Sequence, residues 1–231
     1  MTIDLNVSGE PSQPSVLLVP AHADHGSLTW QVAQSFAEGA VSDGVTAARL
    51  LDLHADGFNA SFEANDLAYY RQGRAEVAGD VELAPEVLHH QELIRQAGVT
   101  VMVFPVYWWS MPAILKGWID RVWTRDWAFG RAPATADSPG KVQGRLGDRD
   151  IFSIALGADS EDVFQRHGYL DAMYAQLDHG VLEYSGVKPP NRHIFFGSED
   201  PSGDAQRDML DRAYQLGVDA AVSAGKIAAN S

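Results

Sequence analysis

The loop at residues 106–109, Val-Tyr-Trp-Trp, could hold a planar ligand with polar edges. It follows a continuous apolar run at 99–104, which is typical of a strand buried on both faces. Pro105 ends this strand because proline cannot donate a ladder hydrogen bond. In an open parallel sheet, ligands bind where strands pass into helices, so flat aromatic faces and backbone N–H groups suit such a ligand here. A packed aromatic core that binds nothing is the alternative from this pattern.

A helix is expected directly after this loop, beginning at Pro112, where the missing N–H costs nothing. Its apolar residues recur along one stripe, at Ile114, Leu115, Trp118, Ile119, Val122 and Trp123. Gly117 lies inside this helix at some cost in helix propensity. We therefore predict that another segment of backbone passes close to Gly117.

A second strand–loop–helix unit, near the N-terminus, could bind phosphate. The apolar run at 15–19 predicts a strand, residues 20–26 form a loop, and Ser27 opens an amphipathic stretch. Unpaired N–H groups and the dipole at a helix start attract anions. The segment is neither a P-loop nor a GxGxxG motif, and a capped helix beside a polar loop is the alternative. We interpret His25 as a solvated side chain.

Other chemistries find little support. A metal site would rest on His22 and His25 alone, in a loop without supporting ligands. His89 and His90 are adjacent, so they point to different faces of a helix, and we assign both to the surface. A hydrolase is disfavoured because the chain has no G-x-S-x-G elbow.

The rest of the chain continues the alternation of strands and helices. Further strands are expected at 45–52, 151–156 and 194–197, and helices at 67–71, 84–96, 171–182 and 204–227. This order predicts an α/β fold, a doubly wound five-stranded parallel sheet with helices on both faces. We place a flexible polar tail at 1–14 and a single domain at 15–231. The Pro- and Gly-rich stretch at 131–150 is interpreted as a functional lid or interface loop, or as a disordered surface loop.

Composition limits the possible partners. The net charge is −14 with a pI near 4.8, and such a surface repels nucleic acid and anionic lipid. The absence of cysteine excludes thiolate chemistry. There is no apolar run long enough to span a membrane and no secretory n-region or h-region. We therefore expect a cytoplasmic protein without membrane insertion.

The motif PVYWWxxPAILKGWxDRV at 105–122 resembles the signature of the NAD(P)H:quinone oxidoreductases of the flavodoxin-like fold. That family includes DT-diaphorase and the bacterial modulator-of-drug-activity and potassium-efflux ancillary proteins. The resemblance extends over residues 15–225 and is strongest at 104–129. It implies a flavodoxin-like fold and a bound flavin, FAD in preference to FMN. It also implies a homodimer with flavin sites at its interface.

The resemblance further implies a set of site residues. Those matching the cofactor-binding positions are His22, Ser27, Leu28 and Thr29 for the phosphates, and Pro105, Val106, Tyr107, Trp108, Gly157, Ala158 and Phe164 for the flavin ring. His167 and Tyr107 are the expected catalytic residues. His167 would donate to the developing hydroquinone oxygen or neutralise charge on the reduced ring, since a histidine titrates near neutral pH.

Several positions depart from the family pattern. Thr29 stands where relatives often have Asn, and Ala155-Leu156 stands where they carry two threonines. Phe164 falls near a tyrosine of the relatives but cannot donate a hydrogen bond. Tyr169 is a possible substitute for that tyrosine.

The function implied is a flavin-dependent NAD(P)H dehydrogenase that reduces quinones. NAD(P)H would pass a hydride to the flavin and leave, and a quinone or similar planar acceptor would take its place, which predicts ping-pong kinetics. The alternative is a flavin-binding regulatory or ancillary subunit with little turnover, an idea favoured by the departures at Ala155-Leu156 and Phe164. Oxidation of NAD(P)H with a quinone acceptor distinguishes the two hypotheses, because turnover well above that of free flavin excludes a purely regulatory role.

Overall fold

A six-stranded, mainly parallel sheet forms the centre of the fold. The computed structural model describes residues 2–5, 13, 15–72, 81–132, 140–187, 191–200 and 202–229. The strand order is β1-β3-β2-β4-β7-β8, and all neighbours are parallel except β1 and β3. The strands are β1 (Thr2–Leu5), β2 (Ser15–Pro20), β3 (Ala47–Leu51), β4 (Val99–Pro105), β7 (Asp150–Gly157) and β8 (Asn191–Phe196). The five predicted parallel strands are therefore confirmed, in a doubly wound order.

The sixth strand corrects two expectations, the five-stranded sheet and the polar tail at 1–14. Residues 2–5 form β1, which pairs antiparallel with β3 at the edge of the sheet. Ile3 and Leu5 pack on the core at one face, which is the alternation of a half-buried edge strand. Four residues are too few for that period to stand out in the sequence. Most of the remaining tail lies outside the described residues.

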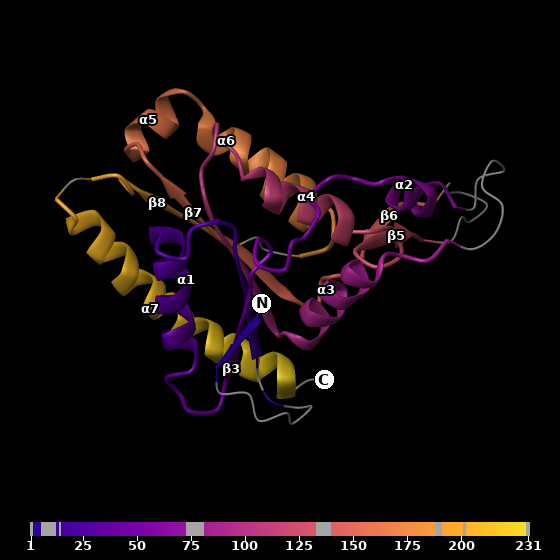
Figure 1. The fold of residues 1–231 in the computed structure, drawn as a ribbon, viewed down its shortest axis with the longest axis horizontal. Coiled ribbons are helices and arrows are strands. Elements are labelled where there is room, and N and C mark those ends of the chain that lie inside the picture. The colour runs from indigo at the N-terminus through magenta and orange to yellow at the C-terminus, as the bar shows by residue number, and fades with distance from the viewer. Residues whose placement is uncertain are drawn as a thin grey trace.

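Helices cover both faces of the sheet (Figure 1). On one face lie α1 (Leu28–Ala40) and α7 (Asp204–Ala229), which pack on a core that includes Trp30, Phe36 and Met209. On the other face lie α3 (Pro85–Gln96), α4 (Ala113–Val122), α6 (Tyr169–Met173) and the π-helix η1 (Tyr174–Glu183). The helix expected at 171–182 is thus a short α-helix that continues as a π-helix. The remaining described helices are α2 (Ala64–Arg71) and α5 (Glu161–Arg166).

Glycines allow two close backbone crossings. A Cβ atom on Gly117 in α4 would lie 2.0 Å from the carbonyl oxygen of Ala60, which confirms the predicted close approach. Between α1 and α7 the arrangement is reciprocal. A Cβ on Gly39 would lie 2.0 Å from the Tyr214 oxygen, and one on Gly217 would lie 2.0 Å from the Phe36 oxygen.

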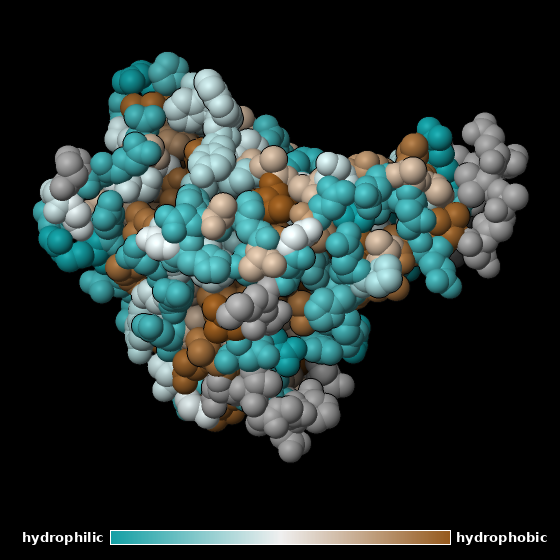
Figure 2. Space-filling model, in the orientation of Figure 1, coloured by the Kyte–Doolittle hydropathy of each residue, from teal (hydrophilic) through white to brown (hydrophobic). Residues whose placement is uncertain are grey.

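The stretch at 131–150 contains part of a small hairpin. Strand β5 (Phe129–Arg131) pairs antiparallel with β6 (Val142–Gly144), and residues 133–139 between them lie outside the described part. The hairpin and α2 lie at the same end of the molecule (Figure 1). Figure 2 shows a mostly hydrophilic face with small groups of apolar residues, some of them at this end. None of the helices described is long and apolar enough to cross a bilayer.

Candidate functional site

The sheet brings three loops together at one edge. Pro20 at the end of β2 pairs with Val103 of β4, and Pro105 at the end of β4 pairs with Leu156 of β7. The Val106 N–H then donates to the Leu156 oxygen at 2.8 Å. Because the carboxyl ends of parallel strands lie at one edge, the loops after β2, β4 and β7 are neighbours, as expected for a ligand site at this fold position.

The loop after β2 leads into α1 and presents hydrogen-bond donors. Ser27 is the N-cap of α1, and its Oγ accepts from the Trp30 N–H at 3.5 Å. The N–H groups of Leu28 and Thr29 lie in the first turn, where they have no intrahelical acceptor. The side chain of Thr29 is buried, with 2% exposure, so the backbone N–H is what this residue can offer an anion.

His22 is held in one orientation by the same loop. Its Nδ1 accepts the N–H of Asp24 at 3.0 Å, and its carbonyl oxygen accepts the Trp30 indole N–H at 2.9 Å. A neutral His22 therefore carries its proton on Nε2, which can donate to a phosphate oxygen.

His25 is exposed to solvent, as the sequence interpretation expected, but it also makes a specific contact. Its side chain is 59% exposed but not simply solvated, since Nε2 lies 2.6 Å from Oδ2 of the buried Asp52. His22 therefore bonds within its own loop, through Asp24, whereas His25 bonds to Asp52 in the loop after β3. Within the described residues, no group of three or more His, Asp or Glu side chains could hold a metal ion.

The loop after β4 is a tight turn of two tryptophans. The N–H of Tyr107 donates to the Ser110 oxygen at 2.9 Å, and the reverse bond is 3.1 Å. Trp108 and Trp109 have φ values of 49° and 64°, in the left-handed region that non-glycine residues rarely adopt. Trp108 is 93% exposed. Such strain concentrates at ligand sites.

The Trp109 ring forms an aromatic cluster with the segment after β7. Trp109 stacks on Tyr169, with centroids 3.7 Å apart and planes 10° apart, and it meets the edge of Phe164 at 5.5 Å. Phe164 is buried in turn against Gly157, where a Cβ atom would lie 2.8 Å from the Phe164 ring. A larger residue at position 157 would therefore require the buried Phe164 ring to shift.

A cavity of about 170 Å³ opens between these two loops. Its lining residues are Val106, Trp108, Trp109, Ala158, Asp159 and Phe164. The structure thus brings together four of the residues expected at the flavin ring. Pro105 and Gly157 lie directly behind them, at the ends of their strands.

The two expected catalytic residues lie outside this lining. Tyr107 is 51% exposed, on the turn. His167 is exposed at the end of α5, with its ring stacked on Tyr169 at 5.5 Å. Tyr169 stacks on both His167 and Trp109. The sequence had indicated Tyr169 only as a possible substitute for a tyrosine of the relatives. Trp109 belongs to the loop at 106–109 that the sequence placed against a planar ligand, whereas Asp159, directly after the expected Ala158, was missed as a lining residue.

The donors and the aromatic turn fit a flavin. The start of α1, with unpaired N–H groups in its first turn, and the strained aromatic turn follow neighbouring strands. The first offers unpaired N–H groups to phosphate and the second offers apolar faces to a ring system.

Comparison with known proteins identifies a family and a similar chain. A family model described as a flavodoxin-like fold matches residues 14–216. The chain is 30% identical over 206 residues to a ribosyldihydronicotinamide dehydrogenase [quinone] of Rattus norvegicus, covering 84% of this chain and 87% of the relative.

Solved structures show the same fold. An NAD(P)H:quinone oxidoreductase from Methanothermobacter marburgensis aligns with a TM-score of 0.75 and 23% identity, over 89% of this chain and 98% of the other. An FMN-dependent NADH-azoreductase from Bacillus anthracis, in complex with FMN, aligns with a TM-score of 0.60 and 21% identity, over 91% and 99%.

Proposed function

This chain belongs to the flavodoxin-like fold family, and from that premise we propose that it is a flavin-dependent NAD(P)H:quinone oxidoreductase. One observation supports this most directly. A helix start with unpaired N–H groups lies beside a strained aromatic turn at the same sheet edge. Related proteins with the same fold are named as quinone dehydrogenases and oxidoreductases.

The residues of this site have separate tasks. The first turn of α1 and His22 Nε2–H would hold the flavin phosphates, and the turn at 106–109 would support the ring. A bound flavin would supply hydride chemistry between NAD(P)H and a quinone-like acceptor. The N–H groups of the turn and of residues 157–158 would stabilise negative charge at the ring edge. His167 would donate a proton to the acceptor, which requires the rings of Tyr169 and Trp109 to move apart when the acceptor binds.

The choice of flavin remains a prediction. FAD is proposed from the family resemblance, and FMN is the alternative because the solved azoreductase of this fold contains FMN. A homodimer with shared flavin sites is likewise proposed, and so is a cytoplasmic location. If analytical ultracentrifugation at micromolar concentration shows a monomer, the proposal of a homodimer is wrong.

The decisive experiment is a visible spectrum after incubation with FAD or FMN and desalting. A retained flavin band that NAD(P)H bleaches and a quinone restores supports the oxidoreductase. Identification of the flavin after heat release separates FAD from FMN. Double-reciprocal plots of the initial rate against NAD(P)H concentration, at several fixed quinone concentrations, should give parallel lines if the reaction is ping-pong.

The regulatory alternative keeps one specific observation in its favour. Phe164 is buried and cannot donate a hydrogen bond, and Ala155 and Leu156 offer no hydroxyl groups near the end of β7. A protein that retains flavin but turns over no faster than free flavin would have this role. The variant His167→Ala measures whether this exposed histidine contributes to turnover, with exposed His179→Ala as its control.

A further inference from the structure

The segment after β7 places an acidic residue in the wall of the candidate site. Asp159 lines the cavity of about 170 Å³ together with residues of the aromatic turn at 106–109. Its carbonyl oxygen accepts the Gly197 N–H at 3.2 Å, and the Gly157 oxygen accepts the Ser198 N–H at 3.0 Å. These bonds tie the segment to the loop after β8, so the backbone at residue 159 has a fixed position beside the cavity.

The carboxylate of Asp159 cannot lie far from this cavity. An aspartate side chain is short, so each of its rotamers leaves the carboxylate close to the wall that the residue forms. The side chain is exposed, and it makes no ion pair with any residue in the described part of the chain. Arg166, the nearest cation along the sequence, pairs instead with Asp162 at 2.9 Å. The wall of the cavity therefore carries a negative charge.

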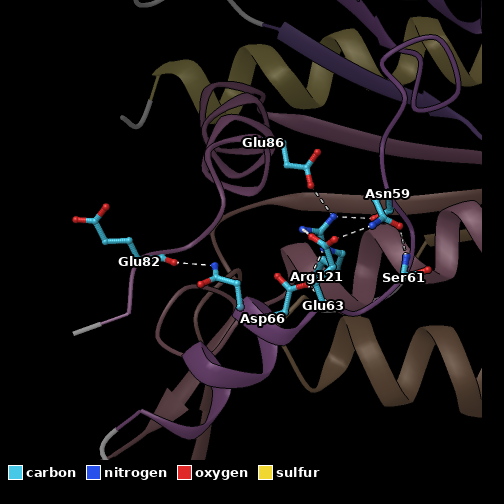
Figure 3. Close-up of polar contacts among 8 residues, drawn as sticks. Asn59, Ser61, Glu63, Asp66, Glu82, Glu86 and Arg121 are labelled. Atoms are coloured by element: carbon cyan, nitrogen blue, oxygen red, sulfur yellow. Dashed lines mark hydrogen bonds and ion pairs between the residues drawn. The ribbon is translucent and has the colours of Figure 1, made fainter. Parts of the chain in front are cut away.

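A second cluster, at the far end of α4, shows how the same chain compensates carboxylates elsewhere. Figure 3 shows Glu63 and Glu86 close to the Arg121 guanidinium, at 3.2 and 2.5 Å, and Asp66 pairs with the same group at 2.8 Å. Among the described residues, no cation takes the place of Arg121 beside Asp159. The charge of Asp159 therefore acts on whatever molecule occupies the cavity.

We propose that Asp159 selects the electron acceptor by its charge, so that the site favours neutral and cationic planar acceptors over anionic ones. This inference rests on the proposed function, because it concerns the molecule that takes electrons at this cavity. An anionic acceptor would be repelled by the Asp159 carboxylate, and a cationic one would be attracted. Repulsion of the wrong molecule is a general source of specificity. The diphosphate of NAD(P)H is separated from the nicotinamide ring by a ribose, so its charge can stay outside the cavity.

The first test compares three acceptors of the flavin-loaded chain: neutral 1,2-naphthoquinone, anionic 1,2-naphthoquinone-4-sulfonate and cationic methylene blue. The measured quantity is kcat/KM for the acceptor, which in a ping-pong reaction reports only the acceptor half-reaction. In Asp159→Asn, the ratio of the sulfonate value to the neutral quinone value should rise about fivefold, and the ratio for methylene blue should fall about fivefold. Added salt should reduce both differences between the variant and the unaltered chain.

Glu161→Gln is the matched control. It removes the same charge two residues away, from an exposed side chain that does not line the cavity. Both ratios should stay within twofold of those of the unaltered chain. A shift as large as that of Asp159→Asn would show that the general field of the surface, and not Asp159, selects the acceptor.

A binding measurement gives a readout apart from turnover. Naphthalene-2-sulfonate and naphthalene-2-sulfonamide are similar in shape and differ in charge, and isothermal titration measures the affinity of each for the flavin-loaded chain. In Asp159→Asn the dissociation constant of the sulfonate should fall about fivefold relative to that of the sulfonamide. Unchanged ratios in Asp159→Asn would overturn the role of Asp159. If the chain retains flavin but reduces no neutral quinone, the proposed function is wrong, and the two dissociation constants still decide whether Asp159 discriminates by charge.

Discussion

His25 Nε2 lies 2.6 Å from Asp52 Oδ2 and so ties the loop after β2 to the loop after β3. The other oxygen of Asp52 accepts the backbone N–H groups of His54 and Ala55, both at 3.0 Å. The His25 ring packs on Trp30, with centroids 4.5 Å apart, and Trp30 in turn holds the His22 carbonyl. The pair therefore braces the loop that is proposed to hold the flavin phosphates.

Replacing His25 should loosen this loop. In His25→Ala the pair is lost, and the dissociation constant for FAD should rise about fivefold, since a hydrogen bond of this kind contributes about 1 kcal/mol. Quenching of flavin fluorescence measures it. His54→Ala is the control, because His54 is exposed in the adjoining loop and should bind FAD normally. Equal binding by both variants would show that the pair does not support the site.

Gly117 should not tolerate a methyl group. In Gly117→Ala the Cβ would lie 2.0 Å from the Ala60 carbonyl oxygen, and backbone cannot move as a side chain can. We expect a loss of more than about 3 kcal/mol in urea unfolding, by overpacking. Gly225→Ala is the matched control within α7, where no atom lies within 4 Å of the added Cβ. That variant should gain about 0.5–1 kcal/mol from helix propensity.

Arg121 should stabilise the fold far more than an exposed cation. Its side chain is 0% exposed and pairs with Asp66, whose side chain is 3% exposed. Arg121→Met leaves a buried carboxylate without its partner, and we expect a loss of about 3–5 kcal/mol. The control is Lys116→Met, which breaks an exposed pair with Asp120 and should cost less than about 1 kcal/mol. Urea unfolding of both variants at neutral pH compares them, and similar losses would contradict the role of Arg121.

His90 should make stability fall in acid. Burial lowers its pKa from 6.5 to about 4, with further contributions from His89 and Arg121. The unfolded chain then binds more protons below pH 6.5, so the free energy of unfolding should decline from there towards pH 4, by at most roughly 3 kcal/mol from this group. His90→Gln should flatten this decline, whereas His89→Gln at the exposed neighbour should preserve it. Some decline remains in either case, because burial also lowers the pKa of His193.

Local patterns predicted the elements well, because each element carries its own period and stop signals. The apolar run at 99–104 is β4, and Ser27 caps α1 as expected for a strand–loop–helix unit. Gly117 was interpretable because its position conflicts with helix propensity, and such a conflict points to tertiary packing.

Contacts between distant segments were harder to predict. His25 and Asp52 meet only because β2 and β3 are neighbours, and neither residue signals the other in the sequence. His90 was assigned to the surface, but its Nδ1 accepts the Trp118 indole N–H at 3.1 Å within the core. The stack of Trp109 on Tyr169 likewise depends on the path of α5, a helix for which the sequence carries no clear signal.

The reciprocal crossing of α1 and α7 bears on how the chain is completed during synthesis. Residues 28–40 pack against residues 204–229, so α1 cannot complete its packing until the much later helix α7 has been synthesised. The opposite face is covered by segments between residues 85 and 183. On the ribosome, the part of α1 that contacts α7 therefore stays open until residues 204–229 have emerged, and the nascent chain needs protection by chaperones during this period.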